Sequence, residues 1–342
     1  MATIWVLLRD IIAFSNQFFP HPIALLRSYR FSPADLAIES PTKDKQSSPT
    51  PLTTIDVLSH NVNNEAAHNP TRRRRILRAI FSSGAQIILL QETNPSWEEL
   101  LREDAVALEF VYTYFHHPGP SDRKAGGSAI LSLFPIDVDK IQMLDFSDKV
   151  SGSVFPSMLC DVSIPTKPAR RSSITTTSTQ GNINIAITIA NIHLRPPVNL
   201  DGSAWLDTAR KTEPIRINEV KELIRRSQES KRTIDIIAGD FNEGDDSGAI
   251  RHLIQEGYSN ALSQYVPRSK ETHRWNYFGR VWQLRKRLDH ILWHSDALSS
   301  TRGEDCRLKL DCVNCGVLSG YENDASDHQP VLSRFAIIKE II

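Results

Sequence analysis

At 342 residues, the chain is long enough for one large domain or two ordinary ones, with a substantial core. Its composition, 40% hydrophobic and 23% charged, is that of a globular protein. The formal net charge is zero, which excludes a global field that would hold the protein on nucleic acid or an anionic membrane, so any polyanion binding must come from local patches.

We predict an N-terminal extension and flexible linker over residues 1–53, followed by a folded domain over residues 54–342. Residues 40–51 are rich in Pro, Ser, Thr and Lys, which is typical of a linker. Before them, the apolar residues of positions 4–12 fall on one helical face, but no apolar run reaches the ~18 residues of a spanning helix. A helix packed on the domain and a membrane-surface anchor both fit this segment, and the cellular location stays open.

Several short apolar runs end in polar residues that can do chemistry. The runs are 55–62, 86–90, 183–192 and 234–238, and the polar residues at their ends are Asn61, Glu92, His193, Asp240 and Asn242. Two further polar groups flank later runs, namely Asp289 at the start of 288–293, and Asp327 with His328 just before 331–337. Each run predicts a buried strand, and residues at such strand ends sit on a rigid scaffold yet can reach a ligand.

The segment Gly239-Asp240-Phe241-Asn242 is the most informative of these ends. On extended backbone, Asp240 and Asn242 point the same way, and a carboxylate beside an amide suits gripping and deprotonating a water. The same four residues also have the composition of a simple turn.

Helices are predicted over 97–108, 212–227 and 247–257, and after Thr71, which we expect to cap a helix ending at Ser83-Gly84. Arg72 to Arg75 crowd the first turn of that helix, where cations oppose the macrodipole; a solvated face and an anion-binding surface are both compatible with this run. Further strands are predicted over 110–115, 129–134 and 156–164. Because 182–193 follows 156–164 as a hairpin, the pattern disfavours a doubly wound parallel sheet.

Residues 268–287 interleave seven basic side chains with four large aromatic ones. This composition suits phosphate and base or sugar contacts, and Arg274, Trp275 and Arg280 are the candidate substrate-binding residues. A solvated loop with cation–π packing has the same composition. Cys312 and Cys315 have a zinc-like spacing with no second pair after them, which favours free thiols or a local disulfide.

The order of these motifs resembles the endonuclease/exonuclease/phosphatase superfamily. The resemblance covers residues 55–335 and includes the Gly-Gly-Ser-Ala-Ile-Leu-Ser run that starts at Gly126. It implies an α/β (α+β) fold, a four-layer α-β-β-α sandwich in which two mostly antiparallel mixed sheets lie face to face with helices outside. Tyr112 and Tyr114 are the candidates for a tyrosine that some nuclease members add to the site.

The same resemblance implies a Mg²⁺-dependent hydrolase of phosphate esters, with Mn²⁺ as a possible substitute. Glu92 would be the main metal ligand, with Asn61 and Asp327 beside it. Asp240, held by Asn242, would activate water; His193 and His328 would bind phosphate oxygens; Asp289 would orient His328. Nucleic acid, a phospholipid headgroup and a small nucleotide remain open as substrates, and no obligatory protein partner is implied. The alternative is a catalytically degenerate member that acts as a binding scaffold.

Overall fold

The computed structural model describes residues 51–107, 109–117, 119, 124–166, 184–198, 208–277, 282–295, 298, 306–318 and 325–341. The predicted extension and its membrane-surface alternative lie outside these residues, apart from the start of the first strand. Among the helices of the described ranges, none is both long and apolar enough to cross a membrane.

The first sheet has six strands in the order β13-β14-β1-β2-β4-β3. Their bounds are β1 Thr53–Asn61, β2 Ile87–Thr93, β3 Tyr112–His116, β4 Gly127–Ser132, β13 Cys306–Val317 and β14 Val331–Ile341. Only β1 and β2 are parallel, and every other pair is antiparallel. The apolar run 87–90 is buried at every position, as expected for a central strand covered on both faces.

The second sheet also has six strands, in the order β5-β6-β7-β8-β12-β9. Their bounds are β5 Gln142–Leu144, β6 Ser157–Pro165, β7 Asn184–His193, β8 Ile236–Asp240, β9 Tyr258–Asn260 and β12 Asp289–His294. The strands β6 and β7 pair antiparallel, which confirms the predicted hairpin, while β7 and β8 are parallel. The sheet is therefore mixed, and a doubly wound parallel arrangement is excluded.

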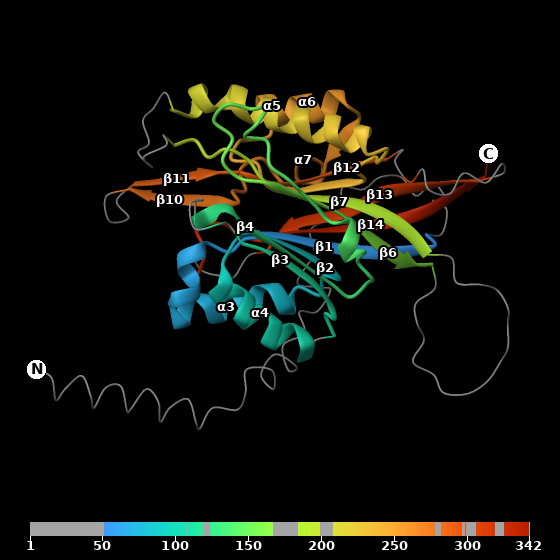
Figure 1. Ribbon diagram of the computed structural model, residues 1–342, viewed down its shortest axis with the longest axis horizontal. Helices are drawn as coiled ribbons and strands as arrows, with labels where there is room; N and C mark the ends of the chain where they lie inside the picture. The colour runs from blue at the N-terminus through green and yellow to red at the C-terminus, as the bar shows by residue number, and fades with distance from the viewer. Residues whose placement is uncertain are drawn as a thin grey trace, which may run out of the picture. The chain divides into compact units, whose positions relative to one another are not determined.

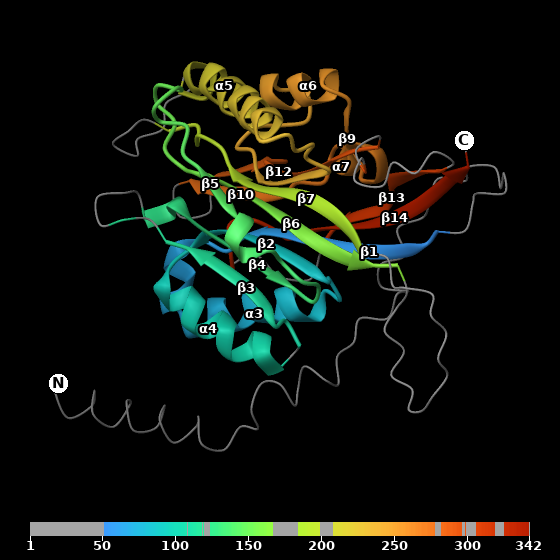
Figure 2. The ribbon, with the colours of Figure 1, turned by 45° about the vertical axis from the view of Figure 1, so that its right-hand side comes forward.

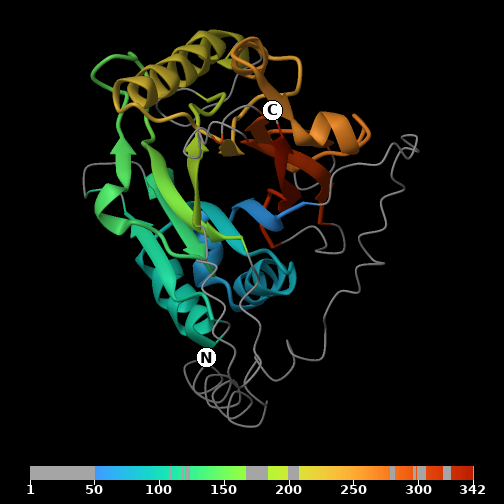
Figure 3. The same cartoon turned by 90° about the vertical axis from the view of Figure 1, so that its right-hand side faces the viewer.

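The two sheets face each other with helices on their outer faces, as Figure 1 and Figure 3 show. Helices α3 (Pro70–Ser82) and α4 (Pro95–Ala107) cover the first sheet, and α5 (Thr208–Glu229) and α6 (Gly248–Gln255) cover the second. Fully buried side chains of both sheets, including Val57, Leu89, Ile187 and Ile236, form the core between them. The predicted four-layer sandwich is therefore confirmed.

The shorter elements lie in the connections. They are the 3-10 helices η2 (Asn64–His68), η3 (Lys124–Gly126) and η4 (Val138–Lys140), the helix α7 (Ala261–Tyr265), and the hairpin of β10 (His273–Tyr277) and β11 (Trp282–Lys286). This hairpin forms a separate two-stranded sheet, which extends to the left of the main sheets in Figure 1. The turned view of Figure 2 again shows α3 and α4 below the sheets and α5 and α6 above them.

Polar side chains join the two sheets near the site. The Nδ2 of Asn191 on β7 donates to the carbonyl oxygens of Leu90 (3.0 Å) and Ala129 (3.1 Å) in the first sheet. Its Oδ1 accepts from Gln91 Nε2 at 2.6 Å. Because the amide of Asn191 is fully paired across the core, it holds the strand ends of both sheets in a defined relation.

The structure corrects one local prediction, adds a strand that was not predicted, and describes two of the cysteines. The cap of α3 is Asn69, whose Oδ1 accepts from the backbone N–H of Thr71 and Arg72, because Pro70 already starts the helix. The strand β13 was not predicted, although apolar and charged residues alternate along it. Cys312 and Cys315 lie on this strand as free buried thiols, in agreement with the first of the two alternatives given for them.

Candidate active site

Strand pairing sets three of the predicted residues side by side in the second sheet. His193 at the end of β7 is the register partner of Asp240 at the end of β8, and Asp240 is also the partner of Asp289 at the start of β12. Register partners on neighbouring strands point to the same face of a sheet. The three side chains therefore form a row at one edge of the sandwich.

Gly239 is needed for this row because β7 passes very close to it. A Cβ atom at this position would lie 1.9 Å from the carbonyl oxygen of Ile192, and its φ of +149° is one that L side chains rarely adopt. Only glycine permits both the close approach and this backbone conformation. The residue before Asp240 is thus dictated by packing between the two strands.

Asp240 lies at the centre of the cluster and is 1% exposed. Its Oδ2 accepts from Asn61 Nδ2 at 3.1 Å, and the Nε2 atoms of His193 and His328 each lie 3.6 Å from the same oxygen. Its Oδ1 accepts from the backbone N–H of Asn242 at 2.8 Å. A carboxylate, which can only accept, therefore faces nitrogen groups from four directions.

The two imidazoles differ in what holds them. The Nδ1 of His328 lies 2.9 and 3.0 Å from the carboxylate oxygens of Asp289. Burial alone would lower the pKa of His328, but the charges of Asp289 and Asp240 outweigh it and raise the pKa well above its usual value. His193 instead stacks on Phe155, with ring centroids 4.2 Å apart, and its Nδ1 has no hydrogen-bond partner among the described residues.

Glu92 enters the cluster from the first sheet. Its Oε1 accepts from Asn61 Nδ2 at 3.1 Å, so this one amide contacts both Glu92 and Asp240, and its Oε2 accepts from the backbone N–H of Asn64 at 3.3 Å. Desolvation by the surrounding protein raises the pKa of Glu92.

Backbone strain is concentrated at this site. Among the described residues, five that are not glycine have positive φ, and three of them, Asn63 (59°), Glu92 (58°) and Asn242 (55°), belong to the cluster. Such conformations cost free energy and persist where the surrounding structure enforces them, most often at functional sites.

Asp327 completes the group from the loop before β14. Its Oδ1 accepts from Asn63 Nδ2 at 2.9 Å, and its backbone carbonyl accepts from Arg274 N–H at 2.9 Å. Burial alone would raise the pKa of Asp327, but the neighbouring His273, the charge of His328 and the Asn63 hydrogen bond outweigh it and lower the pKa far below its usual range. The structure thus brings together all eight predicted catalytic and metal residues: Asn61, Glu92, His193, Asp240, Asn242, Asp289, Asp327 and His328.

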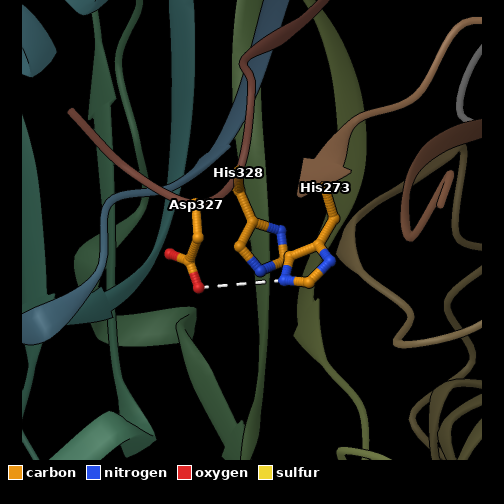
Figure 4. Close-up of side chains that lie close together, drawn as sticks. All are labelled: His273, Asp327 and His328. Atoms are coloured by element: carbon orange, nitrogen blue, oxygen red, sulfur yellow. Dashed lines mark ion pairs between the residues drawn. The ribbon is translucent and has the colours of Figure 1, made fainter. Parts of the chain in front are cut away.

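Sequence-based reasoning missed His273, Asn63, Asn64 and Phe155. His273 opens β10, forms an isolated bridge with His328, and turns its ring toward Asp327 and His328, as Figure 4 shows. The basic and aromatic composition around it pointed to substrate contacts rather than to the site itself. For Asn63 and Asn64, the available signal was that polar residues stand two and three positions after the end of β1.

Comparison with known proteins gives the family. The model of the endonuclease/exonuclease/phosphatase family matches residues 58–328, which is most of the chain. The chain belongs to the endonuclease/exonuclease/phosphatase family. No match was found among curated proteins.

Solved structures share the family's fold with this chain. Humanized D. rerio TDP2 is 15% identical with a TM-score of 0.53, covering 82% of this chain and 98% of that chain. D. rerio TDP2 complexed with a single strand DNA product is 14% identical with a TM-score of 0.53, covering 83% and 99%. A functionally unknown conserved protein from Enterococcus faecalis is 14% identical with a TM-score of 0.50, covering 82% and 99%. At such identities the likeness concerns the fold alone.

Members of this family are mostly metal-dependent phosphoesterases and typically use Mg²⁺. The donor set here fits such an ion in its chemistry, since Glu92 and Asp327 offer carboxylate oxygen atoms, which hard cations prefer. The Oδ1 of Asn61 accepts from the backbone N–H of Asn63 at 3.1 Å, while its Nδ2 faces Glu92. Glu92 also forms no ion pair with a lysine or arginine in the described part of the chain, and desolvation is the largest cause of its raised pKa.

Of the predicted substrate-binding residues, Arg274 has its backbone bonded to Asp327 of the cluster while its side chain turns to Glu271, and the other two side chains cannot be placed. The Nε and Nη2 of Arg274 pair with Glu271 Oε1 at 2.9 and 2.8 Å. The side chain of Trp275 and the whole of Arg280 lie outside the described residues. Tyr112 and Tyr114 are partly buried and pack against the core between the sheets.

Proposed function

We propose that this protein is a Mg²⁺-dependent hydrolase of phosphate esters, either a phosphatase or a phosphodiesterase of the nuclease kind. The observation that carries the proposal is the position of Asp240, whose Oδ2 lies 3.6 Å from each of two imidazole nitrogens and 3.1 Å from Asn61. Attack on a phosphate ester needs an activated water next to groups that neutralise charge on the phosphoryl oxygens. This arrangement offers both within one cluster.

Asp240 would accept the proton of the attacking water. The backbone N–H of Asn242 holds one carboxylate oxygen, so the other is aimed at the space between the two imidazoles. The side chain of Asn242 donates to the carbonyl oxygen of Leu194 at 3.0 Å, which fixes the loop that carries the base. A general base held in this way contributes about 10²–10⁴ to the rate.

The two histidines would donate to the non-bridging phosphate oxygens. His328 is oriented for this by Asp289, which occupies Nδ1 and leaves Nε2 facing the site. A carboxylate behind an imidazole sets its tautomer and stabilises its charged form. His193 presents its own Nε2 to the same oxygen of Asp240.

The metal ion, Mg²⁺ or Mn²⁺, would be held by Glu92 with Asn61 and Asp327. When bound, it neutralises charge that builds up on the phosphoryl and leaving-group oxygens. Asn61 would couple the two halves of the site, since its amide contacts both Glu92 and Asp240.

Three substrate classes present the required phosphate, namely nucleic acid, a phospholipid headgroup and a small nucleotide. The zero net charge counts against a nuclease that relies on many phosphate contacts. One D. rerio TDP2 structure is complexed with a single strand DNA product, so single-stranded DNA belongs among the substrates to test. Arg274, Trp275 and Arg280 would hold the non-reacting part of the substrate.

A panel of phosphomonoesters, phosphodiesters, single- and double-stranded nucleic acids, and phosphoinositide and sphingomyelin vesicles tests the proposal. The wild type should turn over at least one class with Mg²⁺ and none with EDTA, and Asp240→Asn should be roughly 10²–10⁴-fold less active on the same class. The alternative is a binding scaffold, which the complete set of site residues disfavours. Absence of turnover on every class, with retained binding of one of them, would establish the scaffold instead.

A further inference from the structure

Three side chains converge beside the Glu92 cluster, and one of them, His273, has no role in the proposed hydrolysis. His273 on β10, Asp327 and His328 turn toward one another in Figure 4. The rings of His273 and His328 have centroids 4.5 Å apart, and His273 Nε2 lies 3.8 Å from Asp327 Oδ2. Two backbone contacts hold these residues together. His273 and His328 form an isolated β-bridge, and the backbone N–H of Arg274 donates to the carbonyl oxygen of Asp327.

The spacing of the donor atoms is close to that of a metal site. One ligand atom from each of the three residues lies within 4.8 Å of the others. Zinc binds nitrogen and carboxylate oxygen at about 2.0–2.2 Å, which puts tetrahedral ligands about 3.4 Å apart. The 3.8 Å between His273 and Asp327 therefore needs only a small contraction around an ion.

The outer partners of two of these ligands are already in place. Asp289 contacts His328 Nδ1, and Asn63 donates to Asp327 Oδ1, so the atoms left facing the cluster are His328 Nε2 and Asp327 Oδ2. A carboxylate behind a ligating histidine is the usual support of a metal-bound imidazole. The side chain of Asp327 is 41% exposed, which gives an ion access from solvent, whereas both rings are buried.

Two imidazoles and one carboxylate select a different ion from the oxygen set around Glu92. Nitrogen ligands suit Zn²⁺, Co²⁺ and related ions, while Mg²⁺ prefers oxygen. We propose that His273, Asp327 and His328 form a site for a divalent transition-metal ion, with its remaining positions open to water or an anion. The site shares Asp327 and His328 with the proposed hydrolysis and adds His273 to them. Because metal binding is measured without substrate, a failure of this proposal is distinguishable from a failure of the proposed function.

The test uses the metal-free full chain, from which any polyhistidine tag has been removed. One titration adds Co²⁺ and is followed by visible absorption, and a second adds Zn²⁺ and is followed by calorimetry. The wild type should bind one equivalent of Co²⁺ with the absorption of a nitrogen-ligated ion, and excess Mg²⁺ should not displace it. His273→Gln should abolish the absorption and weaken Zn²⁺ binding by at least about tenfold. Asp327→Asn, which keeps the shape of the carboxylate, should do the same and decides the outcome if His273→Gln fails to fold.

Two variants serve as controls. His252→Gln removes a histidine on α6, in the outer helical layer, and should leave the titration unchanged. Glu92→Gln alters the oxygen set and should also leave the Co²⁺ absorption unchanged. The proposal is overturned if the wild type gives no such absorption, if Mg²⁺ displaces Co²⁺, if His273→Gln titrates like the wild type, or if Glu92→Gln alone removes the signal.

Discussion

The two histidine-bearing regions of the site reach Asp240 symmetrically but are supported differently. The Nε2 atoms of His193, at the end of β7, and His328, in the loop before β14, are equally far from Asp240 Oδ2. Behind His328 stands the carboxylate of Asp289, whereas His193 has the ring of Phe155 against its face. One imidazole is held by charge and the other by packing.

This difference has consequences for how each histidine responds to change. A carboxylate sets the tautomer of its partner and favours the protonated form, so removing it alters charge as well as position. A stacked aromatic ring restrains orientation without adding charge. We therefore expect substitutions behind His328 to lower activity by changing the charge of its imidazole. Substitutions behind His193 should lower activity by loosening the position of its ring.

The largest effect is expected where the two regions meet. Asp240→Asn should lower kcat by roughly 10²–10⁴ with the fold intact, because it removes the carboxylate that both imidazoles face. Turnover on the substrate found in the panel is the measurement, with circular dichroism and the melting temperature as checks of folding. Near-normal turnover by a folded variant would remove Asp240 from the role of base.

A double-mutant cycle separates the two histidines. His328→Ala should cost about 10²–10³ in kcat, typical of losing a donor to developing charge, and Asp289→Ala should cost less. If Asp289 acts through His328, the Asp289→Ala/His328→Ala double variant should resemble His328→Ala alone.

The matched control is the cycle with the other histidine. The reductions in kcat caused by Asp289→Ala and by His193→Ala should multiply in the double variant. The reason is that no hydrogen bond or ion pair joins Asp289 to His193 in the described part of the chain. Coupling of Asp289 to both histidines, or to neither, would contradict the comparison.

A smaller effect is expected from the packing side. Phe155→Leu keeps an apolar group at this buried position but removes the stacked ring, so kcat should fall by about two- to tenfold, the equivalent of roughly 0.5–1.5 kcal/mol. Because this reduction in kcat comes from a displaced ring and not from a changed charge, it should be the same with and without Asp289→Ala. An unchanged kcat would show that the stacking does not position His193.

Glu219 on α5 supports the His193 region, and its replacement should change turnover least. Its expected effect is on stability. Its carboxylate accepts from the backbone N–H of Arg195 at 2.9 Å and from Ser153 Oγ at 2.6 Å, and burial raises its pKa to about 7. The folded state thus binds this proton more tightly than the unfolded state, whose pKa is near 4.5. The resulting stabilisation is full below pH 4.5 and is lost as the pH rises through about 7.

Glu219→Gln should remove that pH dependence, since an amide can still accept from Arg195 and contact Ser153. Between about pH 4.5 and 8, the free energy of unfolding of the wild type should fall relative to the variant by up to roughly 3 kcal/mol. Urea unfolding at both pH values measures this difference. If the free energy of unfolding changed equally with pH in the wild type and the variant, Glu219 would not titrate in this range.

Much of the fold could be predicted because each central strand is a continuous apolar run. The runs that end near Asn61, Glu92, His193 and Asp240 were located within a few residues, and their polar ends proved to be neighbours. The strand β13 was not predicted, although the alternation of apolar and charged residues along it is the pattern of a half-buried strand. Whether the eight clustered residues act as proposed stays a prediction until activity is measured.

The parts of the site that could not be predicted come from loops rather than strands. Asn63 reaches Asp327 only because it adopts a positive φ after β1, and nothing in its local pattern shows where that turn leads. His273 reaches His328 through a backbone bridge between segments far apart in the chain. Such contacts depend on tertiary structure that propensity and periodicity do not encode.

The position of β1 between β2 and β14 also affects how the protein is made. Asp56 on β1 and Arg334 on β14 form an ion pair across 278 residues of sequence. At about 5–20 residues per second of synthesis, one edge of β1 stays open for roughly 15–60 s before its partner emerges. During this time an apolar strand edge is available for wrong pairing. Since Asp327 and His328 immediately precede β14, the site cannot assemble before synthesis reaches that strand, and a nascent chain that stops short of β14 has an unpaired edge and no assembled site.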